Sequence, residues 1–291
     1  MNKSLSRTSL RARLSADRGL LVAPGAYDGI TAKLMQHAGF EAVYMTGAGV
    51  SASRGYPDFG LLTQGEMSEA ASVISQAVDV PVIADADTGY GNELNVTRTI
   101  REYERAGVAG LHIEDQVSPK RCGHLDGKEV VPREEFIAKI QAACAARSDP
   151  DLLIIARTDA RAVVSFDEAI SRANAALAAG ADMAFVEAAE SVEELAAIAQ
   201  LVRGPCLLNM VRGGKTPDVS FSDAQRMGYR MAIVPGLLLG AVWDACDVAL
   251  NQLREAGGPP HSASGIPISE RFRRFGADEW NSLRTKFRSA A

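Results

Sequence analysis

Eight short apolar segments recur along the chain, and a segment with helical periodicity follows nearly every one. Their nearly unbroken apolar character is typical of parallel strands that are buried on both faces. Several of the intervening segments begin with a Ser, Thr, Asn or Asp N-cap and end at a glycine, as at Gly39, Gly107 and Gly180. The predicted strands are residues 20–26, 42–48, 80–87, 110–115, 152–159, 183–188, 205–211 and 231–236.

Eight such alternations over about 250 residues predict a (β/α)8 barrel. A doubly wound open sheet is the alternative, but no GxGxxG motif follows the first predicted strand. We expect one domain, residues 1–291, with the barrel at about 20–255 and a helical C-terminal extension at about 256–291. The aromatic residues of this extension need a surface to pack on, such as a neighbouring subunit.

Composition excludes several classes of protein. The net charge of −5 over 291 residues argues against a nucleic-acid-binding protein, and no apolar run is long enough to span a membrane. Four cysteines without a CxxC pair favour the reducing cytoplasm. The basic N-terminus lacks the apolar core of a secretory signal, and predicts a surface arm or first helix with its arginines facing water.

Polar side chains gather where the predicted strands end. The active site of a barrel of this kind lies at the C-terminal ends of its strands. A charge at one strand end marks only where the strand reaches the surface, whereas charges after four or five strands indicate a functional mouth. The side chains in question are Tyr44, Thr46, Gly47, Asp85, Asp87, His112, Glu114, Asp115, Arg157, Asp159, Glu187 and Asn209.

Asp85 and Asp87 are two residues apart, so a continuing strand would direct both carboxylates to one face. Two carboxylates so close repel each other unless a cation or a proton lies between them. With Glu114 they form an all-oxygen set, which Mg²⁺ or Mn²⁺ prefers. The alternative is that Arg157 and His112 neutralise the pair, and these residues alone do not decide between the two.

The segment PKRCGHLDGK, residues 119–128, contains a cysteine in a basic and glycine-rich loop. A lone cysteine in a barrel is more often structural than catalytic. Here Lys120, Arg121 and His124 would favour the thiolate of Cys122 or bring its pKa near neutral. The two glycines would let the segment move as a lid.

Five motifs together resemble the isocitrate lyase and phosphoenolpyruvate mutase superfamily, in particular its 2-methylisocitrate and 2,3-dimethylmalate lyases and oxaloacetate hydrolases. The similarity runs from about residue 20 to 255, and the cysteine loop is its most specific part. The motifs are DADTGYG (85–91), HIEDQ (112–116), KRCGH (120–124), RTDA (157–160) and GGKTP (213–217).

The resemblance implies a Mg²⁺ site, with Mn²⁺ as a substitute. Asp85 would be the direct ligand, and Asp87 and Glu114 would act partly through water. Asp58 would belong to the loop that covers the metal. The resemblance also implies a homotetramer in which a C-terminal helix is exchanged between subunits.

It further implies a set of contacts to a di- or tricarboxylate substrate. Residues 46–48 would hold the carboxylate of the 2-oxo acid portion, although they read Thr-Gly-Ala where relatives often have Ser-Gly-Gly. Arg157 would bind a substrate carboxylate, and Glu187 would orient Arg157. The implied substrate contacts are Thr46, Gly47, Ala48, Asp85, Gly123, His124, Arg157, Glu187 and Asn209.

The implied reaction cleaves a carbon–carbon bond of a 2-hydroxy acid whose C3 carries a carboxylate. Cys122 would protonate C3 as general acid, with Lys120 and His124 setting its proton affinity. The base that takes the hydroxyl proton would be Tyr44 or a carboxylate near the metal. Closure of the lid, residues 116–130, would exclude water.

Three alternatives stay open beside this lyase. Phosphonopyruvate chemistry is disfavoured because such relatives lack the cysteine loop. Oxaloacetate hydrolase relatives carry a serine near the eighth strand, where this chain has Pro235. A non-catalytic barrel is disfavoured by the intact carboxylates and Cys122. Among the lyases, Arg212 would either bind a third substrate carboxylate or lie on the surface.

Overall fold

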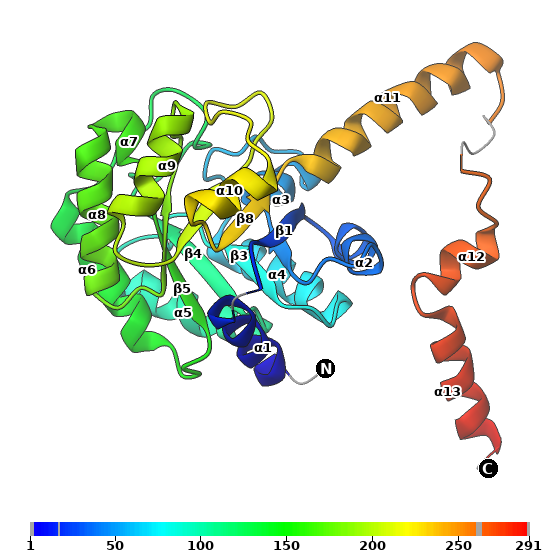
Figure 1. Ribbon diagram of the computed structural model, residues 1–291. Helices are drawn as coiled ribbons and strands as arrows, with labels where there is room; N and C mark the ends of the chain where they lie inside the picture. Colours follow the sequence, from blue (N-terminus) through cyan, green and yellow to red (C-terminus); the bar gives the residue numbers. More distant parts are fainter. Residues whose placement is uncertain (1–2, 17, 260–263, 290–291) are drawn as a thin grey trace. The chain divides into compact units, whose positions relative to one another are not determined.

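The computed structural model describes residues 3–16, 18–259 and 264–289, so the ends of the predicted domain lie outside the described residues. Within these ranges eight parallel strands close into a barrel in sequence order, which confirms the predicted (β/α)8 fold (Figure 1). The strands are β1 (Leu21–Ala26), β2 (Val43–Met45), β3 (Val82–Asp85), β4 (Gly110–Glu114), β5 (Leu153–Thr158), β6 (Met183–Val186), β7 (Cys206–Asn209) and β8 (Met231–Val234).

Helices surround the barrel and follow its strands. Thr63 caps one of them through a capping box, and Gly107 ends another with φ of 99°. Two short helices, α3 (Gly47–Ser53) and α7 (Ala160–Val163), were not predicted. The helices that were predicted around the barrel are α2 (Gly29–His37), α4 (Gln64–Ala77), α5 (Glu93–Ala106), α6 (Arg133–Ala146), α8 (Phe166–Ala178), α9 (Val192–Leu201) and α10 (Phe221–Met227).

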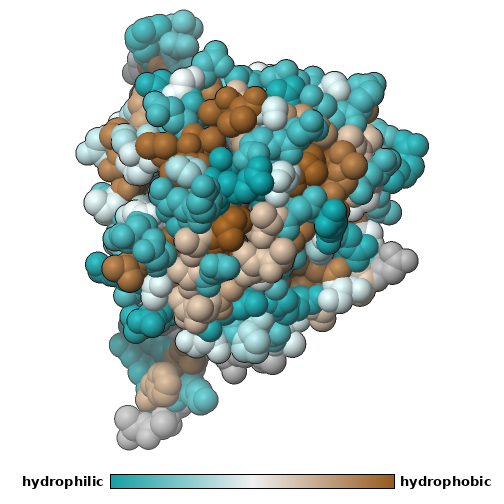
Figure 2. Space-filling view, turned by 90° about the vertical axis from the view of Figure 1, so that its left-hand side faces the viewer, coloured by the Kyte–Doolittle hydropathy of each residue, from teal (hydrophilic) through white to brown (hydrophobic). Residues whose placement is uncertain are grey.

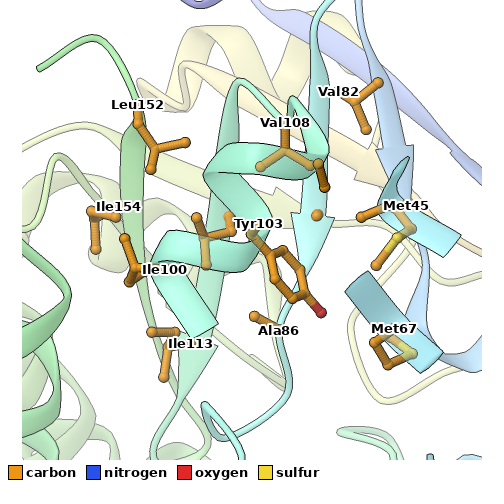
Figure 3. Packing of buried hydrophobic residues seen from close by; sticks show 14 of the residues in the cluster. Met45, Met67, Val82, Ala86, Ile100, Tyr103, Val108, Ile113, Leu152 and Ile154 are labelled. Atoms are coloured by element: carbon orange, nitrogen blue, oxygen red, sulfur yellow. The ribbon is translucent and has the colours of Figure 1, made fainter. Parts of the chain in front are cut away.

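Tyr103 of α5 joins the helical layer to the end of β3. Its ring is fully buried among apolar side chains, as Figure 3 shows for its neighbours Val108 and Ala86. Its hydroxyl donates a hydrogen bond to the backbone oxygen of Asp85 at 3.1 Å. The core between strands and helices therefore also holds the backbone at a strand end where the polar side chains gather.

The N-terminal helix α1 (Lys3–Ser15) is buried on one side against the barrel. Leu10 is fully buried and belongs to the apolar cluster inside the barrel. Arg7 donates from Nε to the backbone oxygen of Val108 at 2.9 Å, and Arg13 forms an ion pair with Glu41 at 3.1 Å. The predicted helix is present, but the prediction that its arginines face water was wrong for these two, because they bind groups at the N-terminal ends of the strands.

The chain divides into two compact units, residues 1–238 and 239–291. The second contains most of α11 (Leu237–Ala256), together with α12 (Ile268–Arg273) and α13 (Ala277–Ser289), and α11 has no buried residue. The predicted boundary near residue 255 falls within α11. No described helix is long and apolar enough to cross a membrane. Over α6–α9 the barrel surface is mixed, with separate hydrophobic patches among hydrophilic residues (Figure 2).

Candidate active site

Arg157 on β5 is a buried cation at the mouth of the barrel. The register of β4 and β5 places it directly beside Glu114, whose Oε2 lies 3.2 Å from Nη1. Asp159 accepts from Nε at 3.0 Å, and Oε2 of Glu187 lies 3.5 Å from Nη2. The guanidinium also lies over the ring of Phe185 at 5.1 Å. Three carboxylates and one ring therefore orient Arg157 before any ligand arrives.

Asp85 ends β3 and is held by backbone donors. Its Oδ2 accepts from the backbone N–H of Gly47 at 3.2 Å, and its Oδ1 accepts from that of Asp87 at 2.9 Å. A Cβ on residue 47 would lie 2.4 Å from Oδ2, so only glycine permits this approach. The flanking Thr46 caps α3 through its hydroxyl, and Ala48 is the second residue of that helix. The structure thus brings the predicted 46–48 segment against Asp85.

The prediction that Asp85 and Asp87 lie on one face of the same strand was wrong. β3 ends at Asp85, and Asp87 has φ of 45°, in the left-handed region. Asp87 still lies in the mouth, because Lys120 Nζ is 3.0 Å from its Oδ1 and also pairs with Asp58. Burial, followed by the charges of Asp85 and Asp58, raises the pKa of Asp87 to about 6 although Lys120 lowers it.

Tyr44 and His112 form a buried polar pair beside Asp85. The Tyr44 hydroxyl lies 2.8 Å from His112 Nε2, which is 3.6 Å from Asp85 Oδ1. Burial lowers the pKa of His112 to about 4, so the ring is neutral near pH 7. Burial also raises the pKa of Tyr44 well above its ordinary value. Tyr44 is therefore a phenol here, and it acts as a base only if its proton passes first to another group.

The predicted cation site fits a divalent ion by charge and by donor type. Three predicted ligands and three neighbouring carboxylates face the cations Arg157, Lys120 and Lys128, so full ionisation would leave negative charge in excess. Both carboxylate oxygens of Glu114 are buried without a hydrogen bond. Burial raises the pKa of Glu114 well above its ordinary value. Among the described residues, no group of three or more His, Cys, Asp or Glu side chains is arranged so that it could hold a metal ion directly.

Neighbouring positive charges favour the ionised form of Asp85, the predicted direct ligand. Burial opposes its ionisation, but the charges of His112, when protonated, and of Lys120 and Arg157 outweigh burial and lower the pKa of Asp85. The expected alternative, neutralisation by Arg157 and His112, is present only in part. Arg157 contacts Glu114, and His112 lies near Asp85, whereas Asp87 is paired with Lys120.

The loop that was predicted to be a lid is closed at its base. Gln116 and Val130 form an isolated antiparallel bridge, and the backbone of Val117 donates to that of Glu129 at 2.9 Å. The residues between Gln116 and Val130 therefore form a single loop that leaves the barrel and returns to it. We call residues 116–130 the lid loop.

Cys122 lies half-buried in the lid loop. Burial raises the pKa of its thiol, and the backbone N–H of His124 and the charges of Arg157 and Lys120 do not offset this. The prediction that basic neighbours favour the thiolate was wrong. Lys120 is occupied by two carboxylates, and Arg121 lies over the ring of Phe59. The group in the loop is a protonated thiol near pH 7.

The two residues after Cys122 pack on the mouth. A Cβ on Gly123 would lie 2.5 Å from Arg157 Nη2 and 2.7 Å from Glu187 Cγ, so this glycine serves close approach rather than flexibility. His124 Nε2 lies 3.5 Å from Glu187 Oε1 and 3.4 Å from Asn209 Nδ2. Asn209 donates to Glu187 at 2.9 Å. The structure brings these predicted substrate contacts together around one carboxylate.

Arg212 lies outside this group. Its side chain is 95% exposed and its nearest carboxylate is that of Asp218, at 4.0 Å. Conversely, Lys128 was not among the predicted site residues, yet it forms a buried ion pair at 2.7 Å with Asp159, which was predicted to lie at the mouth. A lysine after a glycine in the lid loop and an aspartate two residues after Arg157 were visible in the sequence, but their partnership was not.

A family model described as phosphoenolpyruvate phosphomutase matches residues 10–254. The chain is 51% identical to the 2,3-dimethylmalate lyase of Eubacterium barkeri, over 76% of this chain and 77% of that one. It is 45% identical to the 2-methylisocitrate lyase of Aeropyrum pernix, over 87% and 82% of the two chains.

The chain belongs to the phosphoenolpyruvate mutase and isocitrate lyase superfamily. This confirms the resemblance inferred from the five motifs. A solved 2,3-dimethylmalate lyase of this superfamily matches with a TM-score of 0.92 and 42% identity, over 97% of this chain and 95% of that one.

Solved structures of proteins with other activities match about as well. An oxaloacetate acetylhydrolase in complex with 3,3-difluorooxalacetate has a TM-score of 0.93 and 37% identity, over 97% of each chain. A phosphonopyruvate hydrolase in complex with oxalate and Mg²⁺ has a TM-score of 0.87 and 31% identity, over 99% of each chain. The shared barrel alone therefore does not identify the substrate.

We predict that Gly123→Ala opens the lid loop. The added methyl group meets Arg157 Nη2 and must displace the loop or the guanidinium, at a cost of about 1–3 kcal/mol, which is roughly fivefold to 150-fold in the opening equilibrium. Amide hydrogen exchange of residues 117–129 should rise accordingly, while the unfolding temperature stays close to that of the wild type. Gly65→Ala in α4 is the matched control, because nothing lies within 4 Å of its added Cβ. Equal exchange in both variants would contradict the packing described above.

Proposed function

We propose that this protein is a Mg²⁺-dependent carbon–carbon lyase that cleaves a 2-hydroxy acid whose C3 carries a carboxylate, with 2,3-dimethylmalate as the preferred type. Cleavage between C2 and C3 of that compound gives pyruvate and propanoate. The observation that carries the proposal is the closed lid loop, which holds a protonated cysteine beside an oriented arginine and a buried carboxylate cluster. The homology to 2,3-dimethylmalate and 2-methylisocitrate lyases supports it.

Arg157 and the backbone of residues 46–48 hold the two substrate carboxylates in this proposal. Arg157 is turned by Glu187 and Asp159, and Asn209 and His124 complete the binding surface around Glu187. Asp85, with Asp87 and Glu114 behind it, holds the metal. A bound divalent cation lowers the pKa of a coordinated hydroxyl group and stabilises negative charge on oxygen.

The reaction moves two protons and breaks one bond. A base takes the proton of the 2-hydroxyl group, the C2–C3 electron pair passes to C3, and C2 becomes the 2-oxo carbon. The carboxylate on C3 delocalises the resulting negative charge, and Arg157 stabilises it. The Cys122 thiol then gives its proton to C3. Because Tyr44 stays a phenol, we assign the base to a carboxylate of the Asp85 group, with Tyr44 as hydrogen-bond donor.

The choice of a dicarboxylate follows from the cations at the mouth. Lys120, Lys128 and Arg157 already face carboxylates of the protein, and burial lowers the pKa of His124, which keeps its ring neutral. Arg212 points into solvent. A third substrate carboxylate would thus enter without a free cation, which is costly in a buried site.

We also propose a homotetramer in which α11 is exchanged with a second copy. Large apolar side chains of α11 are exposed in the single chain, and such a face is typical of a subunit contact. They include Leu237, Val242, Trp243, Val248, Leu250 and Leu253. All four cysteines are free, which suits the proposed location in the cytoplasm.

The substrate is tested with a panel of five compounds in the presence of Mg²⁺. These are 2,3-dimethylmalate, 2-methylisocitrate, isocitrate, oxaloacetate and phosphonopyruvate, with pyruvate measured by lactate dehydrogenase and other products by chromatography. We expect kcat/KM for 2,3-dimethylmalate to exceed that for either tricarboxylate by about tenfold or more, and to vanish with EDTA. Preference for oxaloacetate or phosphonopyruvate would replace the lyase with the activity of those relatives, and no turnover of any compound would refute it.

Cys122→Ser should lower kcat by about 100-fold or more, because a serine hydroxyl is a much weaker acid than a thiol. Mg²⁺ affinity, measured by calorimetry, should change by less than about twofold, since Cys122 lies in the lid loop and not among the predicted ligands. Cys144→Ser is the matched control, a partly buried cysteine in α6. Near-normal turnover of the Cys122 variant would exclude the general-acid role.

Trp243→Glu should dissociate the tetramer, because it places a charge within the apolar face of α11. Sedimentation equilibrium should give a mass near four times 30.9 kDa for the wild type and a smaller mass for the variant. Leu94→Glu, an exposed leucine at the start of α5, is the control. A wild-type protein that sediments as a monomer would rule out the assembly.

A further inference from the structure

Lys128 belongs to the lid loop, yet its ammonium group is buried against the end of β5. Its Nζ lies 2.7 Å from Asp159 Oδ1 and donates to the backbone oxygen of Gly123 at 2.5 Å. The exposed fractions of the Lys128 and Asp159 side chains are 2% and 0%. A single cation thus joins the lid loop to the strand that carries Arg157.

Asp159 divides its two oxygens between two cations. Oδ2 accepts from Arg157 Nε at 3.0 Å, whereas Oδ1 is shared between Lys128 at 2.7 Å and Arg157 Nη2 at 3.3 Å. Arginine and carboxylate groups otherwise favour two parallel short bonds. Lys128 therefore holds the oxygen that would complete this pair, and Arg157 Nη2 is only loosely engaged.

Arg157 Nη2 is also the atom that faces the lid loop. A Cβ on Gly123 would lie 2.5 Å from it, and Glu187 Oε2 lies at 3.5 Å. The closed loop and the loosely engaged nitrogen meet at one place. Closure of the loop therefore brings the backbone of Gly123 against the nitrogen of Arg157 that Asp159 holds least tightly.

Asp159 is fixed independently of the lid loop. Its backbone N–H donates to Asp115 Oδ1 at 2.8 Å, and Asp115 Oδ2 accepts from Thr158 at 2.6 Å and from Arg172 at 3.1 Å. These groups lie on the barrel and its helices. When the loop moves, Lys128 moves relative to Asp159, and Asp159 remains beside Arg157.

We propose that Lys128 is a positioning residue that couples closure of the lid loop to the binding of a substrate carboxylate by Arg157. On closure its ammonium binds Asp159 Oδ1 at 2.7 Å, so Arg157 Nη2 keeps only a longer bond of 3.3 Å to that oxygen and stays available to the carboxylate. With the loop open, Asp159 takes both guanidinium nitrogens and turns them away from the substrate. The role of Arg157 toward substrate rests on the proposed lyase function.

Lys128→Met tests this, because methionine fills a similar volume without the charge. The first measurement needs no turnover: the rate at which iodoacetamide alkylates Cys122, followed by peptide mass spectrometry and normalised to Cys144. We expect a rise of about tenfold or more, because the loop has lost its buried anchor. Removing a positive charge would by itself slow the reaction of the thiol, so a faster rate reports opening.

The second measurement is the split between KM and kcat for the dicarboxylate that the substrate panel identifies. KM should rise by about tenfold or more, and by a larger factor than kcat falls, because Arg157 loses its free nitrogen before the chemical step. Lys128→Arg, which keeps the charge, should restore the alkylation rate to within about threefold. It also decides the case if the methionine variant does not fold.

Lys215→Met is the matched control. Lys215 is a lysine of the neighbouring loop whose ammonium pairs with Asp126 at 2.6 Å, but the Asp126 side chain is 93% exposed, so its loss should change the alkylation rate by less than about twofold. An unchanged alkylation rate in Lys128→Met overturns the proposal. A faster rate with an unchanged KM overturns the coupling to Arg157, since Lys128 then only anchors the loop. Faster alkylation without turnover of any panel compound refutes the lyase and leaves the loop anchor standing.

Discussion

The buried pairing of Arg157 with carboxylates is the constraint on which the site depends. Glu114 and Arg157 lie side by side because of the register of β4 and β5, and a slip of one residue would turn their side chains from the barrel interior to its outer face. A buried guanidinium also requires partners on every side, and Asp159 and Glu187 supply them from the positions directly after β5 and β6. The orientation of the arginine is therefore set by strands, which are the most rigid part of the fold.

The polar mouth departs from ideal backbone geometry at two of its strand ends. Asp87 follows β3 with φ of 45°, and Ala188 follows β6 with φ of 60°. Each turns the chain so that a backbone N–H donates to a carboxylate, from Asp87 to Asp85 and from Ala188 to Glu187. A residue with a side chain in this region costs on the order of 1 kcal/mol, which the packed barrel offsets. The strain lies beside two carboxylates, that of Glu187, which contacts Arg157, and that of Asp85, the proposed metal ligand.

The barrel and the position of its polar mouth could be predicted because both depend on local patterns, namely apolar runs and the residues that end them. The ion pair of Lys128 with Asp159 could not be predicted, since it joins a loop to a strand end 31 residues away. The pKa of Cys122 was misjudged for a related reason: basic neighbours in sequence were assumed to act on the thiol, whereas Lys120 is occupied by Asp87 and Asp58. Charged residues that are close in sequence indicate which groups are in a site, but not which of them form ion pairs with each other.

The same charges support the proposal that a dianionic substrate and a divalent cation bind together in this mouth. Carboxylates outnumber the cations among the described groups there, and burial holds two of them, Asp87 and Glu114, toward the protonated form. A dicarboxylate entering alone would meet this excess of negative charge, and Arg157 is its one loosely engaged cation. The proposed divalent cation at Asp85 would relieve this excess and attract the substrate, because each charge placed in a site of low dielectric constant is stabilised by an opposite charge nearby. In the proposed reaction, closure of the lid loop would remove water and strengthen both attractions when the Cys122 thiol gives up its proton.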